Sequence, residues 1–245
     1  MNIYKDMDNY YVEFDSLMEE GNEVLKYMMD HQKEIVCHAD TTKHHEVYSS
    51  LADDLGILSP SLIAEIVIGG YRKGRKLKQK PKGKGYCLYE FDSANKPLRL
   101  FRYTEEDHLD LVYYFIDYNN TLFAVPCGVS CEDKDRLYIY PTYLYRIEYK
   151  YRDGRIFRYS SITSCSLWHE VYEYVSSDYV ECKEHYYVPE LHGSSKSVPP
   201  GWPGSPMQTW LAKMNMDGKR VSELLFFKLY EDKEELIYEY ERKRR

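Results

Sequence analysis

The chain has 245 residues, 43% of them hydrophobic and 30% charged, so it is long enough to bury a core of its own. Its formal net charge of −7 argues against a protein dedicated to coating nucleic acid. The first residues, MNIYKDMDNYYVEFD, are acidic where a secretory signal is basic and apolar, and no run approaches the roughly 20 apolar residues of a membrane span. We therefore predict a cytoplasmic protein with six reduced cysteines.

The amino-terminal part has the apolar spacing of helices. Between residues 10 and 36, apolar side chains recur at intervals of mostly three, four and seven, which predicts a helix interrupted near Gly21. A second helix is predicted from Ser59, which can cap it, with Pro60 in the first turn and Gly69-Gly70 at its end. The prediction is a helical part over residues 1–70.

A basic tract, YRKGRKLKQKPKGKG, follows at residues 71–85. It holds eight lysines and arginines and no acidic residue, so its charges repel one another, and its glycines add freedom. We predict a linker or loop between the helical part and a second domain over residues 86–245. The alternative is a nucleic-acid site, because clustered cations release counterions from phosphates and tyrosines flank the run. The residues proposed for that site are Arg72, Lys73, Arg75 and Lys76.

The remainder predicts an antiparallel sheet of consecutive hairpins. Tyrosine is unusually frequent, with 27 residues, and it favours strands whose rings pack while their hydroxyls stay wet. The clearest hairpin is YLYRIEYKYRDGRIFRYSS, with strict alternation over residues 143–152 and Asp153-Gly154 as a two-residue turn. This turn sets Tyr149 opposite Arg158 and Tyr151 opposite Ile156.

Five further turns are predicted along the chain, at residues 93–97, 119–120, 176–178, 217–218 and 232–234. Neighbouring strands then pair in sequence order. The predicted fold class is α+β, with the helical part packed on a large, tyrosine-rich antiparallel meander. One long loop rich in proline and glycine, residues 193–206, interrupts the meander, and we expect Trp202 within it to pack on the sheet or on another surface.

A search for catalytic chemistry in the sequence finds no signature. No phosphate-binding glycine loop and no nucleophile elbow occurs. The segment CHADTTKHH at residues 37–45 holds potential metal ligands, but neighbouring histidines diverge on a helix, so a solvated helix start is the favoured interpretation. We predict no catalytic residue, no cofactor and no metal ligand, and hence a protein that is not an enzyme.

The sequences of the predicted hairpins resemble those of a known group of proteins. The segments YKYRDGRI, LYEFDSANKPLRL and MNMDGKRVSELLFF resemble the tyrosine-aspartate repeats of bacterial polymorphic toxins and of proteins encoded beside them. The acidic charge and small size are similar to those of cytoplasmic immunity proteins. The resemblance implies a protein that binds and neutralises a partner, such as a basic toxin domain. The expected partner-binding residues are Tyr145, Tyr149, Tyr151, Arg158 and Trp202.

Two other classes of function stay open at this stage. The first is a nucleic-acid-associated protein that uses the basic tract. The second is an enzyme whose site escapes recognition in the sequence, which would show as perturbed carboxylates or histidines lining a deep polar pocket. No membrane partner is expected.

Overall fold

The computed structural model describes residues 7–50, 57–58, 60–67, 74–129, 137–139, 143–149, 154–230 and 233–242. The chain forms two compact units. The first unit comprises Met1–Glu20, Ser61–Gly69 and Glu148–Arg245, and the second comprises Gly21–Pro60 and Gly70–Ile147. The domain boundaries proposed from the sequence stay predictions.

The long amino-terminal helix is present, but its break lies elsewhere than predicted. Helix α1 spans Met7–Asp30 without interruption, and α2 spans Gln32–Thr41, so the chain breaks at His31. Gly21 is buried in α1, four residues after Leu17 and three before Val24, which are buried too. This spacing keeps Gly21 on the packed stripe of the helix. A glycine there costs about 1 kcal/mol of helix propensity, which packing overcomes.

The second predicted helix starts later than expected. Helix α3 spans Ala64–Val67, and the described residues 60–63 before it are not helical. The hydroxyl of Ser61 accepts hydrogen bonds from the backbone nitrogens of Ile63 (3.3 Å) and Ala64 (3.2 Å). Ser61 therefore satisfies the free amides at the helix start, which was the role predicted for Ser59. Ser59 and Gly69-Gly70 lie outside the described residues.

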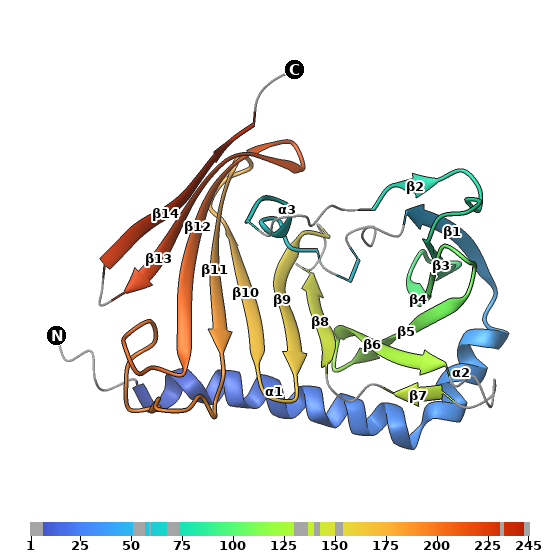
Figure 1. The fold of residues 1–245 in the computed structure, drawn as a ribbon, viewed down its shortest axis with the longest axis horizontal. Coiled ribbons are helices and arrows are strands. Elements are labelled where there is room, and N and C mark those ends of the chain that lie inside the picture. Colours follow the sequence, from blue (N-terminus) through green and yellow to red (C-terminus); the bar gives the residue numbers. More distant parts are fainter. Residues whose placement is uncertain are drawn as a thin grey trace. The chain divides into compact units, whose positions relative to one another are not determined.

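The sheet of the second unit is antiparallel. Its strands are β1 (His44–Ser50), β2 (Lys76–Leu77), β3 (Tyr86–Asp92), β4 (Pro97–Tyr103), β5 (Leu109–Tyr118), β6 (Thr121–Val129), β7 (Leu137–Ile139) and the part of β8 (Tyr143–Tyr149) up to Ile147. Their order is β8-β6-β5-β4-β3-β1-β2, with β7 also paired to β6 (Figure 1). Two residues of the basic tract thus form an edge strand against β1 where a loop was predicted.

One face of this sheet carries the apolar core of the second unit. The buried members are Val47, Leu58, Cys87, Tyr89, Leu100, Leu111, Tyr113 and Ala124. Helices contact the other face: the Tyr27 ring lies 6.0 Å from that of Tyr118, and Asp40 of α2 bonds to Arg99 of β4. Helix and sheet therefore pack together in this unit.

The first unit contains a sheet in strict sequence order. Its strands after β8 are β9 (Ile156–Thr163), β10 (Leu167–Tyr174), β11 (Tyr179–Tyr187), β12 (Met207–Asp217), β13 (Arg220–Tyr230) and β14 (Lys233–Glu241), each antiparallel to the next (Figure 1). The start of α1 packs on it, with the Phe14 ring 5.2 Å from His185 and the Tyr11 ring 5.8 Å from Tyr187. The predicted class, helices on a tyrosine-rich antiparallel meander, is confirmed.

The hairpin turns follow the predicted chemistry closely. Asn119 and Asn120 have φ values of 49° and 63° and join β5 to β6, as a two-residue turn with both residues in the left-handed region requires. The turn between β12 and β13 is one residue later than predicted, at residues 218–219, because Asp217 itself pairs with Arg220. Tyr151 and Asp153 lie outside the described residues, so the register predicted around them stays a prediction.

The loop between β11 and β12 packs on α1. The Tyr11 hydroxyl donates to the Val198 carbonyl oxygen (2.6 Å), and the Lys196 ammonium lies 2.7 Å from the Asp15 carboxylate. Trp202 is half-buried in this loop. The proline-rich stretch is therefore held in place by the helix instead of extending into solvent.

Gly201 in this loop is the position where a glycine is most strongly required. Its φ is +80°, and an added Cβ would lie 2.6 Å from the Leu229 carbonyl oxygen. We expect Gly201→Ala to lower the free energy of unfolding by about 3 kcal/mol, from backbone strain and this clash together. Gly204→Ala is the matched control, since φ is +82° but the nearest atom is 4.0 Å away. Equal losses in urea denaturation would show that the contact with Leu229 relaxes freely.

Candidate functional site

The residues predicted to bind a partner are distributed over the fold. Tyr145 is half-buried at the margin of the second unit's core, with its ring 6.3 Å from that of Tyr113. Tyr149 is 43% exposed and Arg158 forms ion pairs with acidic neighbours, both in the first unit. As a partner surface, these residues and Trp202 stay a prediction, and Tyr151 lies outside the described residues.

The basic tract is exposed where it is described. Arg75 and Lys76 are exposed on and beside β2, whereas Arg72 and Lys73 lie outside the described residues. Lys80 is engaged, because its ammonium lies 2.6 Å from the Asp107 carboxylate and 5.4 Å from the Tyr86 ring centroid. Nucleic-acid binding by this tract stays a prediction.

The edge strand β14 exposes an apolar centre on both of its faces. Three consecutive residues, Leu236, Ile237 and Tyr238, are 51%, 46% and 41% exposed. The register against β13 shifts at Ile237, a β-bulge, so Leu236 pairs with Phe227 and Tyr238 pairs with Phe226. Phe226 and Phe227 are adjacent and point to opposite faces, so the described residues leave apolar side chains of β14 exposed on both faces. β14 is the last strand of its sheet and pairs on one side with β13, which leaves its outer backbone edge without a strand partner among the described residues. Such an edge is a template for another strand.

The ends of β14 are acidic. Its sequence is KEELIYEYE, with glutamates at 234, 235, 239 and 241 and one lysine at 233. Among the described residues, Glu234 forms an ion pair with the Lys213 ammonium at 2.7 Å. We name this surface, Lys233–Glu241, the β14 edge. It combines an apolar centre with negative ends.

A row of half-exposed aromatic rings lies on β10, β11 and β12. The rings of Trp168 and Trp210 stack at 5.7 Å and 25°, and Tyr186 lies 6.0 Å from Trp168. Trp168 pairs across the strands with Tyr186, which is 37% exposed. The tyrosine-rich surface predicted from composition is therefore present, with tryptophans as its centre.

A pair of buried glutamates lies on the same face, two residues along β10 and β11 from the paired Trp168 and Tyr186. Glu170 and Glu184 are direct cross-strand partners and are each 2% exposed. Glu170 accepts hydrogen bonds from the Trp168 indole nitrogen (3.2 Å) and from the Tyr172 hydroxyl. One oxygen of Glu184 has no hydrogen-bond partner among the described residues. Burial, and secondly the charge of Glu170, raise the pKa of Glu184 to about 9.

The buried histidines of the first unit serve packing. His169 shares a hydrogen bond with Ser160 (2.8 Å), and His185 with Thr209 (3.2 Å). Burial, and then the charge of Lys183, lower the pKa of His185 to about 4, so this ring is neutral at physiological pH. A neutral ring is the form that packs against Phe14.

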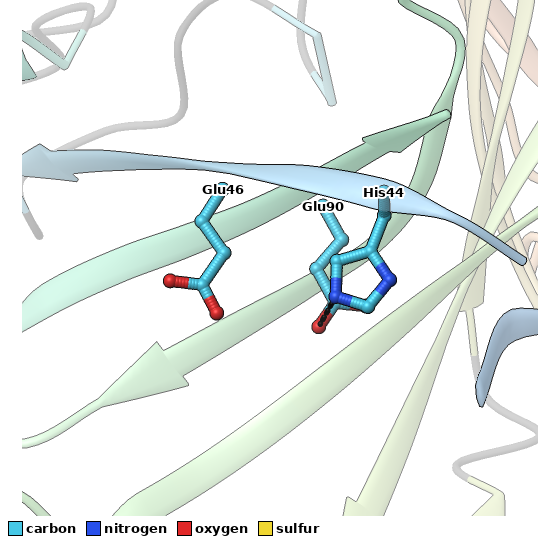
Figure 2. A group of neighbouring side chains, drawn as sticks. All are labelled: His44, Glu46 and Glu90. Atoms are coloured by element: carbon cyan, nitrogen blue, oxygen red, sulfur yellow. Dashed lines mark ion pairs between the residues drawn. The ribbon is translucent and has the colours of Figure 1, made fainter. Parts of the chain in front are cut away.

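A third group lies in the second unit, where the sequence predicted a helix start. The segment 37–45 instead contains the end of α2 and the first two residues of β1. On β1 and β3, one ligand atom each of His44, Glu46 and Glu90 lie within 4.8 Å of one another, and the three side chains project to the same side of the strands (Figure 2). The His44 Nε2 atom lies 3.4 Å from Glu90 Oε1. An imidazole and two carboxylates are a set that binds divalent metals.

Comparison with known proteins finds no matching family model, no matching curated protein and no matching solved structure. Among the described residues, no helix is long and apolar enough to cross a membrane.

Proposed function

We propose that this chain is a non-enzymatic protein-binding protein whose β14 edge pairs with a basic β-strand of a partner protein. The observation that carries the proposal is the exposure of Leu236, Ile237 and Tyr238, all above 40%, on an outer strand. A strand added to this edge would gain main-chain hydrogen bonds and cover apolar side chains on both faces.

Charge decides which kind of strand fits. Four glutamates against one lysine make the β14 edge negative, so a lysine- or arginine-rich strand is attracted to it. In an antiparallel second copy centred on Ile237, Glu235 would face Glu239 and Lys233 would face Glu241, so self-pairing gains less from charge than pairing with a basic strand. Binding and neutralisation of a basic toxin domain, the function implied by the resemblance to immunity proteins, agrees with this polarity.

The test is a binding titration of the full chain with a synthetic strand peptide in which lysine alternates with valine, followed by fluorescence anisotropy. We expect Ile237→Lys to weaken binding about tenfold or more, because it places a cation and removes an apolar contact at the centre of the edge. Val175→Lys is the matched control, since Val175 is 59% exposed but lies in the turn between β10 and β11.

Backbone pairing is tested separately with the same peptide methylated at alternate amide nitrogens, which should abolish binding. Binding that survives methylation, or that Val175→Lys weakens as much as Ile237→Lys, would contradict strand addition. Self-association of the free chain that Ile237→Lys removes would instead assign the edge to a second copy.

A further inference from the structure

We infer that His44, Glu46 and Glu90 form a binding site for a divalent transition-metal ion, with Zn²⁺ the best fit. This inference is independent of the β14 edge, because it rests on residues of the second unit alone.

The strand register brings the three side chains together. Glu46 of β1 is the direct cross-strand partner of Glu90 of β3, and His44 precedes Glu46 by two residues, so all three share one face of the sheet (Figure 2). Two like charges in directly opposed positions destabilise an antiparallel pair. A cation between the carboxylates would turn this repulsion into attraction.

The imidazole of His44 is oriented as a metal ligand. Its Nδ1 atom lies 3.0 Å from the Thr42 carbonyl oxygen, which can only accept, so Nδ1 carries the hydrogen. In the neutral ring, Nε2 then presents its lone pair toward Glu90 Oε1 at 3.4 Å. A backbone carbonyl on the far ring nitrogen is the usual support of a metal-bound histidine. Two ligands of tetrahedral zinc lie about 3.3 Å apart, which follows from bonds of about 2.0 Å.

The charge of the surroundings also favours a dication. Glu90 is buried and Glu46 is exposed. Asp40 of α2 binds the same guanidinium as Glu90. The Arg99 guanidinium is the cation that faces them: it bonds to Asp40 and donates from Nε to Glu90 Oε2 at 2.7 Å. Three carboxylates against one guanidinium leave two negative charges with a neutral imidazole, which is the charge that Zn²⁺ would cancel.

Arg99 and the metal would use different atoms of Glu90. Oε2 is taken by Arg99, whereas Oε1 faces His44, so the guanidinium would orient the carboxylate from outside the metal shell. The carboxylate of Glu46 is exposed, and its Oε2 atom accepts a hydrogen bond from the Tyr48 hydroxyl (3.1 Å), so Oε1 would complete the set. Three protein ligands leave a further coordination position for water. The bound ion would stabilise the pairing of β1 with β3.

The test is calorimetric titration of the chelator-treated full chain with ZnCl₂, together with Co²⁺ absorption as a reporter of tetrahedral ligation. We expect one equivalent to bind, and His44→Ala to weaken binding at least about tenfold. His45→Ala is the matched control: as the next residue on the strand it points to the other face, where its ring stacks on Phe91 at 5.6 Å.

We expect zinc to raise the melting temperature of the wild-type chain. Glu46→Gln, a second variant at an exposed side chain, should remove that rise. Absence of zinc and cobalt binding by the wild-type chain would overturn the inference and leave a protonated His44 as the partner of Glu90. Equal loss of affinity in His44→Ala and His45→Ala would overturn it too, because the two side chains lie on opposite faces of β1 and cannot hold one ion. Unchanged affinity in His44→Ala would assign binding to other residues and would likewise overturn it.

Discussion

Glu184→Gln is expected to raise the free energy of unfolding at pH 7 by about 3 kcal/mol. Glu184 is 2% exposed, lies directly opposite Glu170, and has an oxygen without a hydrogen-bond partner among the described residues. The folded chain therefore keeps Glu184 protonated at neutral pH, while the unfolded chain does not. Glutamine has the same shape and does not titrate, so the free-energy cost of keeping a proton on this side chain in the folded state disappears.

The pH dependence gives the sign of this effect. The pKa of Glu184 is raised from 4.5 in the unfolded chain to about 9 in the folded chain, first by burial and then by the charge of Glu170. Between these two values the folded state binds more protons than the unfolded state, so stability falls as the pH rises. The advantage of Glu184→Gln should vanish near pH 4 and grow steadily up to about pH 9.

The same strands provide the matched control for this experiment. Glu173 and Glu181 are also direct cross-strand partners, but Glu173 is exposed. Glu173→Gln should change stability by less than about 1 kcal/mol. Urea denaturation of both variants at several pH values makes the comparison. A gain from Glu184→Gln that does not vary with pH would mean that the proton is not held in the folded state.

The hairpins could be predicted because their turns are local. Asn119-Asn120 and Ser176–Asp178 specify turn positions from their own backbone preferences, and the structure has both. The second of these turns also sets the register that places Glu170 opposite Glu184. The pairing of Glu170 with Glu184 could therefore be predicted from the sequence. Their burial could not, because it depends on residues distant in the chain.

Other features depend on contacts that no local pattern reveals. The segment HHEVYSS alternates only weakly, and it becomes strand β1 because it pairs with β3, more than thirty positions later in the chain. Helical spacing sets His44 and Glu46 apart, whereas on a strand the two residues share a face. The exposure of the β14 edge was hidden for a similar reason, since an alternating strand sequence does not show which strand ends the sheet.

Arg99→Met is expected to lower the free energy of unfolding by about 3 kcal/mol or more in the presence of a chelator. The Arg99 side chain is 9% exposed and donates to the Glu90 carboxylate, whose side chain is 7% exposed. Removing the guanidinium leaves a buried carboxylate opposite Glu46 with its main compensating charge gone. Arg102→Met on the same strand should cost less than about 1 kcal/mol, because the Arg102–Asp110 pair is over 40% exposed.

A double variant separates the loss of charge pairing from the loss of packing. Arg99 also lies over the Phe101 ring at 5.1 Å, a contact that methionine retains in part. If the unpaired charge of Glu90 is the main cost, Glu90→Gln should restore much of the stability lost in Arg99→Met, since glutamine needs no counter-charge. Additive losses in the double variant would show instead that Arg99 stabilises β4 mainly through packing and through Asp40 of α2.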